Sequence, residues 1–183
     1  MADGKRGLIA GLTVRQPWAG LIGEGVKPYE NRHGVPALDQ GTYLAIQASK
    51  LPSRSRCGED WDAASAVYAR HVAGGGKRVA WMDEYASLAP GGRATASSID
   101  FAMSRPHGAV VAVAVYRGAV RPDGCKPSPW LSGPFGWVLT DPVMIEPIPH
   151  KGRLWVWPVE GDLLERLKAA YDDAGGRRFR GSV

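Results

Sequence analysis

Hydrophobic and polar positions alternate in several short segments of the chain, and this alternation is typical of β-strands. Residues 41–48 place Thr, Leu and Ile on one side and Tyr, Ala and Gln on the other. Residues 108–116 carry valine or alanine at most positions, which predicts a core strand buried on both faces, with alanines small enough for a helix to approach closely. Shorter strands are expected at residues 8–14, directly after Pro28, at 136–139 and at 155–157.

Apolar residues spaced three or four apart predict helices elsewhere. The expected helices are 17–23, 59–72, 79–88 and 162–173. Pro17 is expected at the first position of its helix, where proline is tolerated. Asp162 and Glu165 have the spacing of a capping box for the last helix. The glycines at 74–76 lack the full spacing of a phosphate-binding loop, so they predict a turn between two helices.

The segment 25–32 holds two cations and one carboxylate directly after the predicted helix that carries Trp18. If the chain is extended after Pro28, the side chains of Glu30 and Arg32 lie on the same face. One interpretation is that the carboxylate orients the guanidinium toward a phosphate, a carboxylate or a base edge. The other is a surface ion pair that joins a strand to a turn and contributes little free energy.

Four separated motifs occur in an order that resembles the ASCH domain family. Residues 16–19 match its QPWA opening, and Gly25, Lys27, Glu30 and Arg32 match its G-x-K-x-x-E-x-R pattern. Residues 136–139 and 147–152 are similar to its closing strands. The resemblance covers about residues 10–50 and 108–158. It implies an α+β chain with a PUA-like fold, which is a small open β-barrel with flanking helices.

The length of 183 residues and a hydrophobic content of 44% fit one domain, which we expect to span residues 1–176. The family resemblance fades over about residues 51–107, so we expect a helical insertion there. The insertion is expected either to cover the mouth of the barrel as a lid or to pack outside it. Glycines at 91–92 and serines at 97–98 predict a mobile connection within it. Residues 177–183 are expected to be a basic flexible tail.

The resemblance implies a protein that binds nucleic acid, either RNA or single-stranded DNA, or a modified nucleoside, in a cationic cleft at the barrel mouth. The alternative is a hydrolase, since some small bacterial members of the family are ribonucleases or amidohydrolases of modified cytidines. In that case Lys27 and Glu30 are the catalytic candidates. Amidohydrolase members have a threonine nucleophile where this chain has Glu30, so their mechanism does not transfer intact. A third hypothesis is a regulatory domain in which the ionic motif only stabilises the fold.

The candidate binding residues are cations, hydrogen-bond donors and aromatics near the matched motifs. They are Arg15, Gln16, Trp18, Lys27, Glu30, Arg32, Lys50, Trp130, His150 and Lys151. Trp18 and Trp130 are expected either to stack on a base or to pack in the core. Trp155 and Trp157 are expected to be structural.

The net charge of +5 and a sequence pI near 9.4 favour a polyanionic partner, but the cations are spread thinly along the chain. Cys57 and Cys125 lie far apart, without the spacing of a zinc site, and we expect no metal and no cofactor. No apolar stretch is long enough to span a membrane, so we expect a cytoplasmic protein. The sequence leaves the oligomeric state open.

Overall fold

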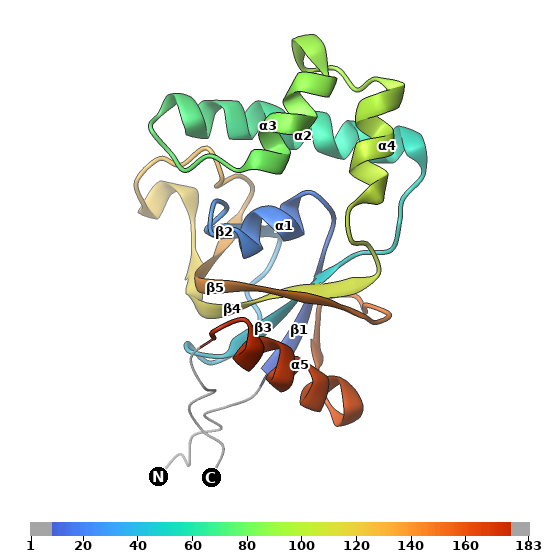
Figure 1. Cartoon of the computed structure of the whole chain (residues 1–183). Helices are drawn as coiled ribbons and strands as arrows, with labels where there is room; N and C mark the ends of the chain where they lie inside the picture. The colour runs from blue at the N-terminus through green and yellow to red at the C-terminus, as the bar shows by residue number, and fades with distance from the viewer. Residues whose placement is uncertain (1–8, 177–183) are drawn as a thin grey trace, which may run out of the picture.

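One curled sheet forms the centre of the protein, as a computed structural model of residues 9–176 shows (Figure 1). Its strands are β1 (Ile9–Val14), β2 (Tyr29–Arg32), β3 (Tyr43–Ala48), β4 (Ala109–Val120), β5 (Phe135–Pro149) and β6 (Val156–Pro158). The spatial order is β2-β5-β4-β3-β1-β6. Only β1 and β3 run parallel, and the other neighbours pair antiparallel. The fold is therefore α+β, with a sheet that closes about half of a barrel.

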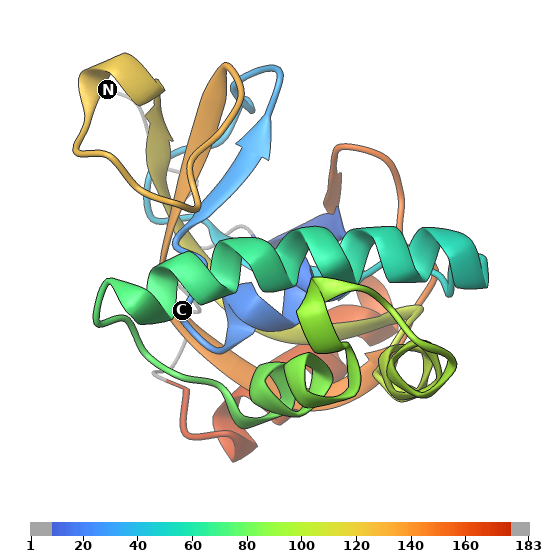
Figure 2. The ribbon, with the colours of Figure 1, turned by 90° about the horizontal axis from the view of Figure 1, so that it is seen from above.

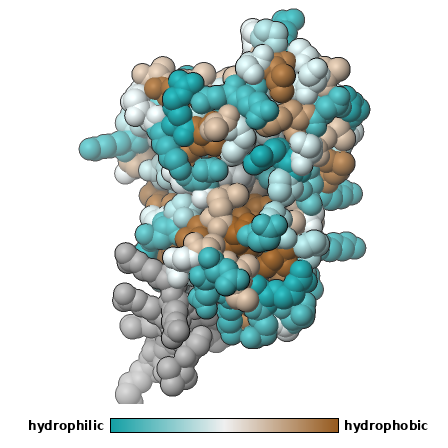
Figure 3. All heavy atoms as spheres, viewed as in Figure 1, coloured by the Kyte–Doolittle hydropathy of each residue, from teal (hydrophilic) through white to brown (hydrophobic). Residues whose placement is uncertain are grey.

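Helices cover both faces of this sheet (Figures 1 and 2). They are α1 (Trp18–Gly23), α2 (Arg54–Ala73), α3 (Ala80–Leu88), α4 (Ala96–Ser104) and α5 (Gly161–Asp173), with 3₁₀ turns at Pro90–Gly92 and Pro122–Gly124. The short α1 lies directly on the sheet, and α2, α3 and α4 lie above it. Helix α5 covers the opposite face. Apolar side chains reach the surface in the middle of the face seen in Figure 3, between these upper helices and α5.

The approach of α1 to the sheet depends on small side chains, as the alanine-rich pattern predicts. Residues 109–116 of β4 are all buried. A Cβ atom added at Gly23 would lie only 2.9 Å from the Cβ of Ala112, so the helix and the strand have no room for a larger pair. Leu12, Ile22 and Leu44 belong to the same hydrophobic cluster as Ala112. The close contact fixes the position of the chain that enters β2.

The insertion packs into a second hydrophobic core and is not a separate flap. Trp61 of α2 lies at its centre, with ring centroids 5.7 Å from Trp81, 4.8 Å from Tyr85 and 6.0 Å from Phe101. Leu21 of α1 belongs to the same cluster. Burial of this much aromatic surface holds the three insertion helices against the barrel.

The prediction of a mobile connection at residues 97–98 is wrong, because they form the first turn of α4. The side chain of Thr95 accepts a hydrogen bond from the backbone of Ser98, and the Ser98 side chain accepts one from the backbone of Thr95. This reciprocal capping satisfies the free N–H groups at the start of the helix. Serine favours either a loop or a cap, and sequence spacing alone did not separate the two.

Four other features of the helices and strands differ from the predictions. The expected capping box of α5 is absent from the described structure: Glu160 is the N-cap residue, and Asp162 lies in the first turn, 3.4 Å from Arg166. Helix α2 begins earlier than expected, at a cap that Ser53 provides. Strand β5 is much longer than the expected 136–139. Pro17 precedes the first helical residue as the N-cap of α1.

The predicted basic tail at 177–183 lies outside the described residues. Within residues 9–176, no helix has both the length and the apolar character that a membrane span requires.

Gly11 tests how tightly β1 packs against β6. A Cβ atom at this position would lie 2.2 Å from the indole ring of Trp157, its partner across the strands. We expect Gly11→Ala to lower the free energy of unfolding by about 1 to 3 kcal/mol through overpacking. Urea denaturation measures the change. Gly124→Ala is the control, since a Cβ there meets no atom within 4 Å; equal midpoints for the two variants would contradict the packing described.

Candidate functional site

A pocket of about 510 Å³ opens beside the two edge strands, β2 and β6, under the C-terminal half of α2. Its lining comes from six separated parts of the chain: the end of β1 with the start of α1, the β2 region, the end of β3, the C-terminal half of α2, the loop before β5 and the loop before β6. The lining residues are Thr13, Val14, Arg15, Trp18, Lys27, Glu30, Asn31, Arg32, Ser49, Val67, Pro129, Trp130, Ser132, Arg153, Leu154 and Trp155.

The ionic motif forms a buried cluster at this pocket. Glu30 lies between two cations, with Lys27 Nζ 2.7 Å from its Oε2 and an Arg32 amino nitrogen 3.1 Å from its Oε1. The predicted placement of Glu30 and Arg32 on one face is therefore confirmed. Lys27 is only 4% exposed and also donates to the carbonyl of Tyr29. The interpretation as a surface ion pair is wrong, because burial makes each charge depend on its partner.

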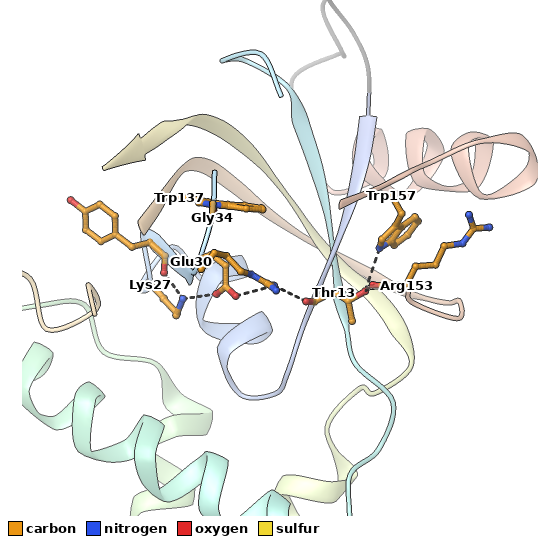
Figure 4. Close-up of polar contacts among 9 residues, drawn as sticks. Thr13, Lys27, Glu30, Gly34, Trp137, Arg153 and Trp157 are labelled. Carbon is orange, nitrogen blue, oxygen red and sulfur yellow. Dashed lines mark hydrogen bonds and ion pairs between the residues drawn. The ribbon is translucent and has the colours of Figure 1, made fainter. Parts of the chain in front are cut away.

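Arg32 connects the cluster to Thr13 of β1; Figure 4 shows the series of contacts from Lys27 and Glu30 to Thr13. Its guanidinium donates to the carbonyl of Thr13 in β1 at 2.9 Å. The Thr13 hydroxyl in turn donates to the carbonyl of Arg153 at 2.8 Å and accepts from Trp157 Nε1 at 3.3 Å. One continuous series of polar contacts thus joins the edge strand β2 to β1 and to the loop before β6.

Tryptophan side chains form much of the pocket wall. Trp18 of α1 is half-buried, and Lys27 Nζ lies 5.9 Å from its ring centroid. Trp155 was expected to be structural, but it lies before β6, lines the pocket and is 46% exposed. Its φ angle of +61° is unusual for a bulky residue. Trp157, the other residue expected to be structural, is buried as predicted.

Trp130 forms a fixed wall, because three hydrogen bonds hold its loop. Asn31 Nδ2 donates to the carbonyl of Trp130, and Asn31 Oδ1 accepts from the backbone of Ser132, both at 3.0 Å. Trp130 Nε1 donates to His71 Nδ1 of α2 at 3.1 Å. The residue is buried within the second core, so the prediction of core packing is confirmed, and the residue also lines the pocket.

The insertion contributes a charged contact at the pocket rim. Arg15 is half-exposed and lies 2.8 Å from the carboxylate of Asp60 in α2, which Arg56 also approaches at 3.4 Å. Burial raises the pKa of Asp60, and the charges of Arg15 and Arg56 counteract the rise. With Val67 also in the lining, α2 forms one side of the site.

Four predicted site residues do not line the pocket. Gln16 is buried, where its Oε1 accepts from the backbone of Gly20 at 3.1 Å and positions α1. Lys50 and Lys151 are exposed outside the lining. His150 stacks on the indole of Trp157, and burial, together with the charges of two arginines, lowers the pKa of its imidazole.

Sequence reasoning missed several pocket residues. Asn31 was not among the candidate residues, yet it holds the Trp130 loop. Arg153, Leu154 and Trp155 follow the matched motif directly, and the basic and aromatic character of this run was a signal that they belong to the site. Nothing in the sequence around Thr13 indicated a role at the site, because its contacts with Arg32, Arg153 and Trp157 form only when distant segments pair.

Residues 9–176 contain no group of three His, Cys, Asp or Glu side chains that is arranged to hold a metal ion. Cys57 and Cys125 are free thiols in the structure, and burial is the main reason that the pKa of Cys57 is raised. The donors at the pocket are cationic and neutral nitrogens and hydroxyls, and this set suits an anion or a base better than a metal.

The chain matches no protein-family model, and no curated protein is significantly similar to it in sequence. Its resemblance to the ASCH family therefore stays a prediction from the motifs.

Glu30 tests the dependence of the fold on the buried cluster. Glu30→Gln leaves two cations without their shared carboxylate, and we expect the free energy of unfolding to fall by about 3 kcal/mol. Urea denaturation measures the loss. The control is Glu59→Gln, which removes an exposed carboxylate 3.3 Å from Arg56 and is expected to change stability by about 0.5 kcal/mol or less. Similar small losses in both variants would show that the cluster does not hold the fold.

Proposed function

We propose that this protein is an ASCH domain with a PUA-like barrel, and that its pocket binds one base of a single-stranded nucleic acid. The observation that carries the proposal is a pocket of about 510 Å³ with tryptophan walls and exposed arginines at its rim. This volume lies in the range of sites for one small molecule, about 300 to 1,000 Å³. One nucleotide therefore fits inside, while its neighbours along the strand stay outside.

The walls and the rim suit different parts of a nucleotide. An indole face such as that of Trp155 stacks on a base of any sequence. The exposed guanidiniums of Arg15 and Arg153 are suited to phosphate groups on either side of the base. Two of the three hydrogens of Lys27 Nζ are engaged by Glu30 and Tyr29, which leaves one for a ligand.

Binding accounts for the geometry better than hydrolysis does. A general base must accept a proton, but Lys27 donates to two oxygen atoms within an ion pair. Both carboxylate oxygens of Glu30 are likewise occupied by cations. Activation of a water molecule by either group would require the cluster to open first.

Arg153→Ala tests the binding function without disturbing the buried cluster. We expect about tenfold weaker binding of single-stranded RNA or DNA in fluorescence anisotropy, because one phosphate contact is lost. The slope of log affinity against log salt should fall by about one. The matched control is Arg117→Ala, an exposed arginine 2.9 Å from Asp141 and outside the pocket. Equal affinities for the two variants, or no binding by the unaltered protein, would contradict the proposal.

Trp155→Ala tests base stacking. We expect it to weaken single-strand binding by about 1 to 3 kcal/mol, since an exposed indole face is lost. Trp155→Phe keeps an aromatic face and should retain most of the affinity. The same anisotropy series measures both, with an abasic oligonucleotide as the second ligand. If the abasic strand binds as tightly as the normal one, the protein contacts the backbone alone and the pocket does not take a base.

A further inference from the structure

We propose that the pocket takes a base extruded from a DNA duplex, and that Leu154 acts as the wedge that fills the space the base leaves. The inference rests on the proposed function, because it names the form of nucleic acid that supplies the base.

Leu154 has an unusual position for a leucine. It is 96% exposed, the highest value among the exposed large hydrophobic residues of the described chain, and it also lines the pocket. A side chain with both properties stands at the pocket mouth. Leaving it in water is unfavourable, so a partner that covers it gains hydrophobic stabilisation. Proteins that kink or open DNA insert apolar side chains of this kind between base pairs.

The flanking charges favour DNA as the duplex. Arg153 lies directly before Leu154, and Lys151 is exposed two residues earlier. Minor-groove proteins combine basic side chains with an apolar wedge in this way. The minor groove of A-form RNA is wide and shallow, so a single leucine fills it poorly.

A wedge must be held firmly enough to separate stacked bases, and both neighbours of Leu154 are anchored. The carbonyl of Arg153 accepts a hydrogen bond of 2.8 Å from the hydroxyl of Thr13 (Figure 4). The ring of Trp155 packs edge-on against Trp137, with centroids 5.2 Å apart. Trp155 also has a left-handed backbone, at φ +61°, which turns the chain at the residue after Leu154.

The pocket itself requires extrusion when the ligand is a duplex. Trp18, Trp130 and Trp155 line the pocket, and a base still stacked between its neighbours has no free face to offer them. Enzymes and reader proteins that enclose one base rotate it out of the helix first, and the unstacking costs free energy that a wedge can offset. Leu154 would thus fill the gap in the base stack, and the pocket would hold the extruded base.

The test uses a DNA duplex with 2-aminopurine at one position, whose fluorescence rises when the base leaves the stack. We expect the unaltered chain of 183 residues to raise the emission severalfold. Leu154→Ala should abolish most of the rise and weaken duplex binding by about tenfold, a larger loss than the one it causes for the single strand. Leu51→Ala is the matched control, since Leu51 is 48% exposed and outside the pocket lining.

The outcomes separate the two proposals. Tight single-strand binding without any emission change in the duplex would overturn extrusion and leave the proposed function standing. No binding of either form would overturn both. An undiminished rise with Leu154→Ala would overturn the role of the wedge, and a rise with a 2-aminopurine RNA duplex alone would overturn the choice of DNA.

Discussion

The buried carboxylate of Glu30 is the constraint on which the rest of the site depends. A buried charge is tolerated only when it is paired, and Glu30 has one partner from each side along the chain, Lys27 and Arg32. Lys27 fixes the turn between α1 and β2, next to the ring of Trp18. Arg32 reaches across to the carbonyl of Thr13 in β1. Edge strand β2, paired in the sheet only with β5, thereby gains a second attachment that sets the width of the opening.

The insertion completes the site because its helices share a core with the barrel. Leu21, Val26 and Trp130 lie in the same hydrophobic cluster as the aromatic side chains of α2 and α3. Through the hydrogen bond from Trp130 Nε1 to His71 Nδ1, and through the ion pair of Arg15 with Asp60, α2 is attached to the pocket on two sides. Helix α2 thus lines the pocket with Val67 and holds Trp130 and Arg15 in place.

Strong local patterns predicted most strands and four of the five described helices, as well as the pairing of Glu30 with Arg32. Ser97 and Ser98 led to the wrong prediction of a mobile connection, because serine is common both in loops and at the start of helices. Burial of Lys27 was not visible in the sequence, since it depends on how α1 lies on β4. The roles of Thr13 and Asn31 were missed for the same reason: each contacts a segment about 100 or more residues away, and periodicity describes only neighbours. The role of Trp155 was missed because its place at the pocket depends on tertiary packing, including its contact with Trp137.

The arrangement of the pocket along the chain has a consequence for how the protein acquires its site. Lining residues extend from the end of the first strand to Trp155, just before the last strand. During synthesis the Thr13 hydroxyl therefore has neither of its two partners until the C-terminal part has emerged and joined β1. A nascent chain that stops before residue 155 lacks one wall of the site, even where its sheet has begun to form. Contacts so distant in sequence form late, and the capacity to bind appears only with the completed domain.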